Sequence, residues 1–175
     1  TPTQLQLTSC SVIDRVNAMN RCPILFLPTL LLLTGAGHAA SSEEDASGAS
    51  KPFVLIARLH ALPGQSSKVI ALSDAADKAV KASEPGMLLH TFDRDPNDAL
   101  GFVWTEVYAN SQALEFHLQN PDLIKYLEEV GPFLDVFTVE LYGSVSDSAV
   151  NMLKATGTPT KHYKTELGYI RDFKQ

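Results

Sequence analysis

Cysteine is scarce in this sequence, and positive charge is outnumbered by negative charge. The two cysteines, Cys10 and Cys22, lie near the start of the chain, and none follows them. The part that is expected to fold therefore has no disulfide and no thiol nucleophile. Lysine and arginine number 14 against 20 aspartate and glutamate, which gives a net charge of −6. Since the sequence has no basic stripe either, binding to nucleic acid is not expected.

Motifs that hold cofactors or activate a serine are also missing. The sequence has no H-x-x-x-H pair and no paired cysteines with the spacing of a metal site. Gly35 and Gly37 are closely spaced but lack the rest of a phosphate-binding loop. The G-x-S-x-G elbow of serine hydrolases is absent. We therefore expect no nucleotide, flavin or metal, and predict that the protein works without a cofactor.

The longest apolar run has the composition of a targeting segment. Residues 1–18 are polar and without pattern, and after them come a basic stretch at 19–21, a leucine-rich run at 23–33 and small residues at 37–40. A basic start, a short apolar core and a small-residue cleavage site are the parts of a secretory signal. The core is short for a membrane span, although a short N-terminal anchor remains the alternative.

This pattern predicts how the start of the chain is processed. We expect Met19 to be the initiator, residues 1–18 to be upstream translated sequence, and residues 19–40 to be a signal or targeting peptide. Cleavage after Ala39 places small side chains at the positions that need them. The mature chain is then expected in the secretory pathway or outside the cell, without a stable membrane span. A plastid leader is an open alternative.

The rest of the chain divides into a linker, a domain and an extension. Residues 41–50 are small and acidic, which is typical of a disordered linker. The domain is predicted over 51–143 and a C-terminal extension over 144–175. In the extension, a short helix is predicted over 147–153, and alternating residues over 163–169 predict a half-buried strand. We expect this strand to reach across a dimer or to cover a sheet edge.

The domain alternates between the periodicities of strands and helices. Strand patterns cover four stretches, at 53–62, 87–93, 100–108 and 133–142. Helical spacing covers three others, at 66–82, 111–119 and 121–130, with Asn120 as a cap before Pro121. The order is the split β-α-β-β-α-β plan, an antiparallel sheet with helices on one face. Since the other face stays apolar, a second copy of the same sheet is its expected cover.

Residues with the chemistry of a site gather in the third strand and the helix that follows it. Along that strand, one face carries three aromatic side chains and one carboxylate, namely Phe102, Trp104, Glu106 and Tyr108. On the helix, Ala113, Phe116 and His117 are predicted to share one side. His117 then lies at the border of an apolar stripe, where its ring needs a polar partner. Glu106 is the nearest candidate in the sequence.

These residues resemble the antibiotic biosynthesis monooxygenase (ABM) family. Further matches are Ala57-Arg58 with Pro63-Gly64, and Glu84-Pro85-Gly86 before the second strand. The resemblance covers roughly residues 53–142 and implies an α+β, ferredoxin-like fold whose antiparallel sheet forms a dimeric α/β barrel. The C-terminal helix and strand are additions to that fold. Relatives include cofactor-independent monooxygenases that act on phenols and quinols, and small stress-induced barrels.

Two functions follow from the resemblance together with these residues. The first is a cofactor-independent monooxygenase for a small aromatic or quinol-type substrate, bound in a homodimer. His117 would be the base, oriented by Glu106. The residues expected to bind substrate are Arg58, His90, Trp104, Tyr108 and Phe116. The second function is a non-catalytic dimeric barrel that binds a small hydrophobic molecule or acts in a stress response. His117 and the aromatic residues then have structural roles, and Arg58 pairs with Glu106 or Asp93.

Overall fold

The computed structural model describes residues 51–171. The predicted leader and linker over 1–50 lie outside the described residues. Within 51–171, no helix combines the length and apolar character that a membrane crossing requires.

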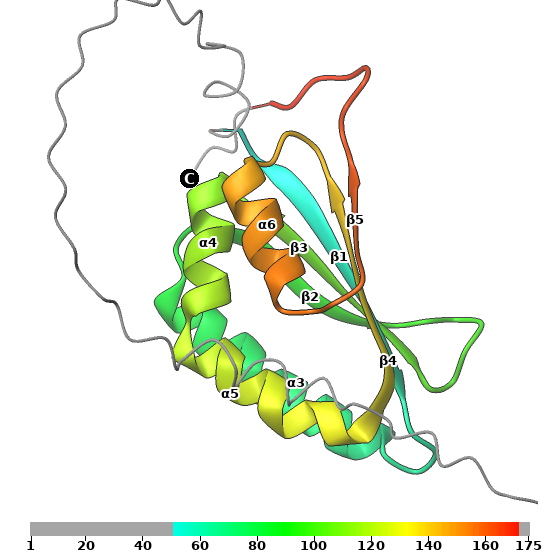
Figure 1. Cartoon of the computed structure of the whole chain (residues 1–175). Coiled ribbons are helices and arrows are strands. Elements are labelled where there is room, and N and C mark those ends of the chain that lie inside the picture. Colours follow the sequence, from blue (N-terminus) through cyan, green and yellow to red (C-terminus); the bar gives the residue numbers. More distant parts are fainter. Residues whose placement is uncertain (1–50, 172–175) are drawn as a thin grey trace, which may run out of the picture.

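The chain follows the predicted strand and helix order (Figure 1). The elements are β1 (Phe53–Ala61), α3 (Ser66–Ser83), β2 (Met87–Arg94), β3 (Gly101–Tyr108), α4 (Ser111–Gln119), α5 (Pro121–Val130), β4 (Leu134–Tyr142), α6 (Asp147–Ala155) and β5 (Thr160–Tyr163). A short 3-10 turn over Gly131–Phe133 joins α5 to β4. The predicted mixed α+β, ferredoxin-like fold with a C-terminal helix-strand extension is confirmed. Its pairing into a dimeric barrel stays a prediction.

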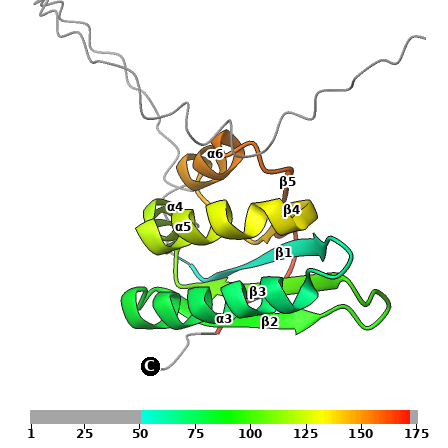
Figure 2. The same ribbon diagram turned by 90° about the horizontal axis from the view of Figure 1, so that it is seen from below.

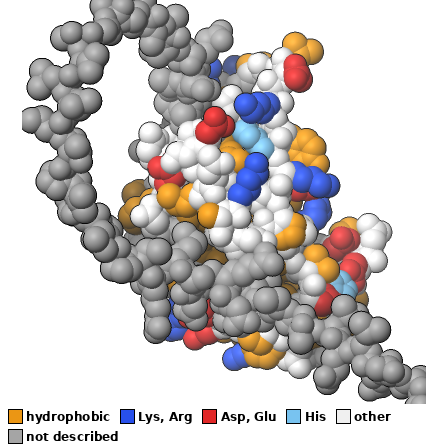
Figure 3. All heavy atoms as spheres, viewed as in Figure 1, with side chains coloured by type: hydrophobic (Ala, Val, Ile, Leu, Met, Phe, Trp, Pro, Cys, Tyr) orange, Lys and Arg blue, Asp and Glu red, His pale blue; other side chains and the backbone are white. Residues whose placement is uncertain are grey.

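The sheet has the strand order β2-β3-β1-β4-β5. All neighbours are antiparallel except β5, which runs parallel to β4. The α-helices lie on one face, with α3 along the β2–β3 side and α6 beside β5 (Figure 2). Because side chains alternate across a strand, one side chain in two along β1 and β3 enters the core beneath these helices. On the surface seen in Figure 3, charged and apolar side chains are interspersed.

The C-terminal strand differs from its prediction. The strand occupies Thr160–Tyr163, and residues 164–171 have no regular structure, with Leu167 94% exposed. The backbone explains the difference, since the last pair in the ladder joins Tyr142 to Tyr163 at the point where β4 ends. Residues beyond 163 have no strand beside them, so their alternation has no sheet to join. The edge of β4 is covered, as expected, while contact across a dimer stays a prediction.

Candidate functional site

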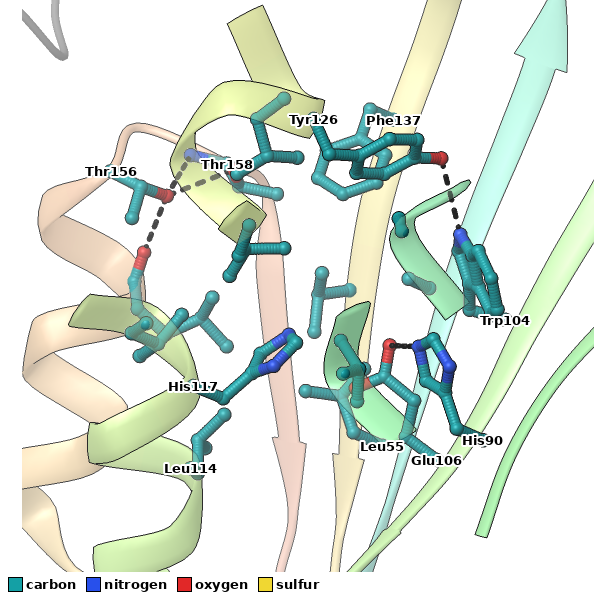
Figure 4. Close-up of a pocket in the computed structure, with 18 residues that line it drawn as sticks. Leu55, His90, Trp104, Glu106, Leu114, His117, Tyr126, Phe137, Thr156 and Thr158 are labelled. Atoms are coloured by element: carbon teal, nitrogen blue, oxygen red, sulfur yellow. Dashed lines mark hydrogen bonds and ion pairs between the residues drawn. The ribbon is translucent and has the colours of Figure 1, made fainter. Parts of the chain in front are cut away.

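A cavity of about 60 Å³ lies between the sheet and the helices (Figure 4). Its walls are mostly aliphatic and aromatic, and its polar groups are few. The lining residues come from every layer of the domain and include Leu55, Ala57, Val80, His90, Trp104, Glu106, Leu114, His117, Tyr126, Phe137, Val139 and Leu153. Two threonines of the extension, Thr156 and Thr158, also line the cavity. The extension is therefore part of the same site.

The start of α4 fixes the position of His117. Asn110 caps the helix, since its side chain accepts a hydrogen bond from the Ala113 backbone N–H at 2.9 Å. The buried stripe of α4 then runs through Ser111, Leu114 and His117. His117 is only 5% exposed. The prediction that Phe116 binds substrate is wrong, because Phe116 is 55% exposed on another side of the helix.

Glu84 holds the imidazole of His117. The Nδ1 atom of His117 lies 2.9 Å from Oε2 and 3.1 Å from Oε1 of Glu84. Asn120 donates a second hydrogen bond to Oε1 of the same carboxylate, at 2.6 Å. All three side chains are buried. The prediction that Glu106 orients His117 is therefore wrong, since this hydrogen bond comes from the turn before β2.

A close contact between a glycine and an alanine brings Glu84 to His117. Gly86 lies against α4, where an added Cβ would be 2.6 Å from the Cβ of Ala113. Its carbonyl also accepts a hydrogen bond from the Ala109 N–H at 2.9 Å. Ala113 and His117 lie one helical turn apart on α4. The turn that contains Glu84 therefore packs against the part of α4 that contains His117.

Replacing Gly86 with alanine is expected to disturb both stability and the histidine. The new methyl overlaps Ala113, so the turn or the helix must shift, at a cost of about 1–3 kcal/mol. The pKa of His117 should fall, because Glu84 moves away. Chemical denaturation and an NMR titration measure the two effects. Adding Ala113→Gly restores the space at a helix penalty of about 1 kcal/mol. If the double variant keeps the lowered pKa, the contact does not position Glu84.

Two opposing influences act on His117. Burial lowers its pKa, but the hydrogen bond that its ring donates to Glu84 and the charges of Glu106 and Glu84 raise the pKa, which ends above the ordinary 6.5. Within residues 51–171, the hydrogen bonds of the His117 ring are made by Nδ1, and Nε2 makes none. The ring projects into the cavity (Figure 4). An imidazole held at Nδ1 with Nε2 toward an apolar space can accept a proton from a bound molecule.

Glu106 faces the cavity as predicted, but with a different partner. It is 5% exposed, and its Oε2 accepts a hydrogen bond from the Tyr108 hydroxyl at 2.6 Å. Burial raises the pKa of Tyr108 well above its ordinary value, and the neighbouring Glu106 raises it further. The hydroxyl therefore remains a donor to the carboxylate. Tyr108 supports Glu106 and is not among the residues that line the cavity, which differs from the predicted substrate contact.

His90 and Trp104 both line the cavity, as predicted for substrate-binding residues. Their rings are stacked, with centroids 4.1 Å apart and planes at 17°. The indole Nε1–H donates to the Tyr126 hydroxyl at 3.2 Å, and that hydroxyl lies 3.0 Å from Oγ of Ser73. These bonds satisfy the polar atoms of a largely apolar wall.

Arg58 does not reach the cavity, so its predicted contact with substrate is wrong. Its neighbours Ala57 and Leu59 face the helices, and alternation turns Arg58 to the open face of the sheet. Its side chain is half exposed there, and its Nε lies 3.4 Å from Oε2 of Glu140. The expected pairing with a carboxylate is found, but the carboxylate belongs to β4.

Comparisons with known proteins show what this part of the chain is similar to. Residues 52–129 match the family model described as antibiotic biosynthesis monooxygenase. This part of the chain, less than half of its 175 residues, is therefore similar to the ABM family. Helix α6 and the loop that follows it lie beyond the matched ABM residues, yet Leu153, Thr156 and Thr158 from this segment supply part of the cavity wall.

Relatives with known sequence or structure match the same region. The uncharacterized protein sll1783 of Synechocystis sp. (strain PCC 6803) is 32% identical over 89 residues, which cover 51% of this chain and 60% of sll1783. The crystal structure of MupZ from Pseudomonas fluorescens matches with a TM-score of 0.57 and 15% identity, covering 69% of this chain and 95% of MupZ. A candidate antibiotic biosynthesis monooxygenase from Caulobacter crescentus CB15 matches with a TM-score of 0.53 and 20% identity, covering 57% and 95%. At these identities, the two structures support the fold alone.

Two residues of the site, Glu84 and Asn120, make contacts that were not predicted from the sequence. Glu84 precedes Pro85 and Gly86, and a carboxylate in such a turn usually faces solvent. Asn120 was recognisable only as a helix cap, and its side-chain N–H₂ adds a bond to Glu84 that spacing does not predict. The one signal in the sequence was the resemblance of Glu84-Pro85-Gly86 to the ABM family, and it does not show that Gly86 lies against α4.

Proposed function

We propose that the ABM-like domain oxygenates a small aromatic or quinol-type substrate without a cofactor, with His117 as the base. The observation that carries this proposal is the buried Glu84–His117 pair, whose imidazole projects into an apolar cavity. A carboxylate at Nδ1 fixes the ring and stabilises the imidazolium that forms when Nε2 takes a proton. The raised pKa of His117 fits a base that must hold this proton during the reaction.

The chemistry requires one proton transfer before oxygen reacts. Nε2 of His117 takes the proton of a phenolic hydroxyl, which leaves an electron-rich anion. Dioxygen then oxidises the anion directly, and one oxygen atom is bound to a ring carbon. The other oxygen leaves as water with the two hydrogens that the quinol loses, so atoms and electrons balance. The apolar walls limit the access of water to the intermediate.

Glu106 can bind the second hydroxyl group of such a substrate. Its carboxylate faces the same cavity as His117, and one of its oxygens is already bound by Tyr108. The other oxygen can accept a hydrogen bond from a second hydroxyl group. A quinol carries two hydroxyl groups, so one can meet His117 and the other Glu106.

The size of the cavity favours a second candidate function. At about 60 Å³ it is far smaller than the ligand sites of roughly 300–1,000 Å³ that are usual for drug-sized molecules. An apolar cavity of about 150 Å³ is known to bind benzene. An aromatic substrate therefore requires half-buried residues such as Leu123, Leu127 and Phe137 to move. Without that movement, the protein is a non-catalytic barrel for a smaller hydrophobic ligand.

Oxygen uptake with a panel of quinols and phenols separates the two functions. The proposed monooxygenase consumes oxygen with at least one member, in stoichiometric yield of an oxygenated product. The non-catalytic barrel is instead stabilised against heat by a member of the panel, without oxygen uptake. Neither uptake nor stabilisation across the panel would contradict both functions.

We also propose that the open face of the sheet pairs with a second copy of the chain. Half-buried and exposed apolar side chains from four strands share this face, namely Val54, Ile56, Leu89, Val103, Val107 and Val136. A single sheet with helices on one side leaves these side chains in water, whereas a two-fold pair buries them.

Replacing Val103 with lysine is expected to weaken such a dimer by about tenfold or more, because a charge would enter an apolar interface. Sedimentation velocity measures the change. Ile124→Lys is the matched control, since Ile124 is exposed on α5 at the helical side of the domain. A monomeric native protein, or equal effects of the two variants, would contradict the pairing.

A further inference from the structure

A chain of ionisable groups leads from the surface of α3 to the buried carboxylate of the site. Asp77 Oδ1 on α3 lies 2.9 Å from His90 Nδ1 on β2. The other ring nitrogen, Nε2, lies 3.9 Å from Glu106 Oε1 on β3. Glu106 Oε2 in turn accepts the hydroxyl proton of Tyr108 at 2.6 Å. Each of the two carboxylates thus meets a different nitrogen of one imidazole.

Exposure falls steadily along this chain. The side chain of Asp77 is 42% exposed, that of His90 is 10% exposed, and that of Glu106 is 7% exposed. Asp77 therefore exchanges protons freely with water, whereas Glu106 has no direct route through the apolar lining of the cavity. His90 lies between them, and an imidazole ring can bind a proton at either of its two nitrogens.

The fold holds His90 in the orientation that such a connection needs. In the antiparallel ladder, His90 is paired directly with Glu106, so both side chains leave the sheet on the same face. The ring lies flat against Trp104, at 4.1 Å between centroids. Trp104 is itself fixed by its hydrogen bond to Tyr126. The two ring nitrogens therefore face different carboxylates, Nδ1 toward Asp77 and Nε2 toward Glu106.

We propose that Asp77 and His90 conduct protons between solvent and Glu106. A proton enters His90 at Nδ1 from Asp77, and the imidazolium releases its other proton from Nε2 to the Glu106 carboxylate. The reverse sequence returns a proton to water, so charge is conserved over each exchange. The gap of 3.9 Å exceeds a hydrogen bond, and a small rotation of the carboxylate or one bridging water closes it.

This path goes beyond the proposed oxygenation and does not depend on it. The groups that face His90 are Asp77 from α3, Glu106 from β3 and the ring of Trp104. The groups that act on Glu106 from the interior are Tyr108 and the charge of His117. An alternative role for Asp77 and His90 is to fix the edge of the sheet to α3 without carrying protons. Exchange of a buried proton distinguishes the two roles.

The Tyr108 hydroxyl proton is the probe of the path. When Glu106 is protonated by His90, the carboxylic acid and the hydroxyl exchange their protons, and the exchanged proton leaves by the same route. The exchange rate is measured in mixed light and heavy water through the isotope effect on the Cζ chemical shift of labelled tyrosine. The Tyr126 hydroxyl is an internal control, because it is also buried but bonds to Ser73 and Trp104.

Asp77→Asn and His90→Gln are each expected to slow the exchange at Tyr108 by about tenfold or more, and to leave Tyr126 unchanged. Asp74→Asn is the matched control, since it removes the same charge from α3 at a residue that pairs with Lys78. It should leave both hydroxyls unchanged. Unaltered exchange at Tyr108 in Asp77→Asn and His90→Gln would overturn the path, as would equal slowing at Tyr126. The result stands whether or not the protein consumes oxygen.

Discussion

Replacing His117 with glutamine is expected to reduce kcat for oxygen uptake by about 10²–10⁴-fold, the range that one general base contributes. Glutamine has an amide that can still donate to Glu84, so the hydrogen bond that anchors residue 117 has a substitute. It cannot accept and hold a proton at neutral pH. The substrate is the member of the quinol panel that gives the fastest uptake, and oxygen-electrode rates measure the loss.

The surface histidine His60 supplies the control for this experiment. It pairs with Asp98 and Asp135 and is not among the residues that line the cavity. His60→Gln should therefore leave kcat unchanged. Equal rates for native protein and His117→Gln would remove His117 from the mechanism, provided that circular dichroism shows the same fold for both. A loss of similar size in His60→Gln would show that the effect is not specific to the cavity.

Replacing Glu84 with glutamine should have the second-largest effect, on both stability and the histidine. The carboxylate accepts from His117 and from Asn120 at once. An amide has only one oxygen, so its N–H₂ group must face one of these two donors. Leaving a buried donor without an acceptor costs about 1–3 kcal/mol. The loss of the hydrogen bond and charge should also lower the pKa of His117.

The loss of stability caused by Glu84→Gln should depend on pH in a definite direction. Because the folded protein raises the pKa of His117 above 6.5, protonation of His117 stabilises the fold fully below that pH. The contribution disappears as pH rises through the folded pKa. The difference in unfolding free energy between native protein and Glu84→Gln should therefore be larger at pH 6 than at pH 9. Glu129→Gln, a change of the same charge on the exposed side of α5, should show no such trend.

The periodicity of the sequence was sufficient for the fold. Alternation along β3 predicted that Trp104 and Glu106 share one face, and the structure buries both on the face beneath the helices. The same two-residue period puts Arg58 on the face opposite Ala57 and Leu59, and the structure shows that this is the open face. The prediction that Arg58 contacts substrate rested on the chemistry of its guanidinium, which does not show which face of the strand carries it.

The polar contacts of the site needed information that periodicity lacks. His117 was found from its place beside an apolar stripe, but its partner was sought among residues close in sequence. Glu84 lies 33 positions away and reaches His117 because Gly86 packs on Ala113. On α4, Phe116 and His117 were predicted to share one side of the helix. Neighbouring residues of a helix differ by about 100° in direction, so with His117 buried, Phe116 faces solvent.

The most direct test of the mechanism compares two pKa values of His117. The pH dependence of kcat/KM for oxygen uptake gives the pKa of the base in the free enzyme, and an NMR titration gives the pKa of the His117 ring. A neutral base is required, so kcat/KM should rise with pH and level off above that pKa. In native protein the two values should agree above 6.5, and in Glu84→Gln both should move together to lower pH. A kinetic pKa that stays in place while the His117 resonance shifts would contradict His117 as the base.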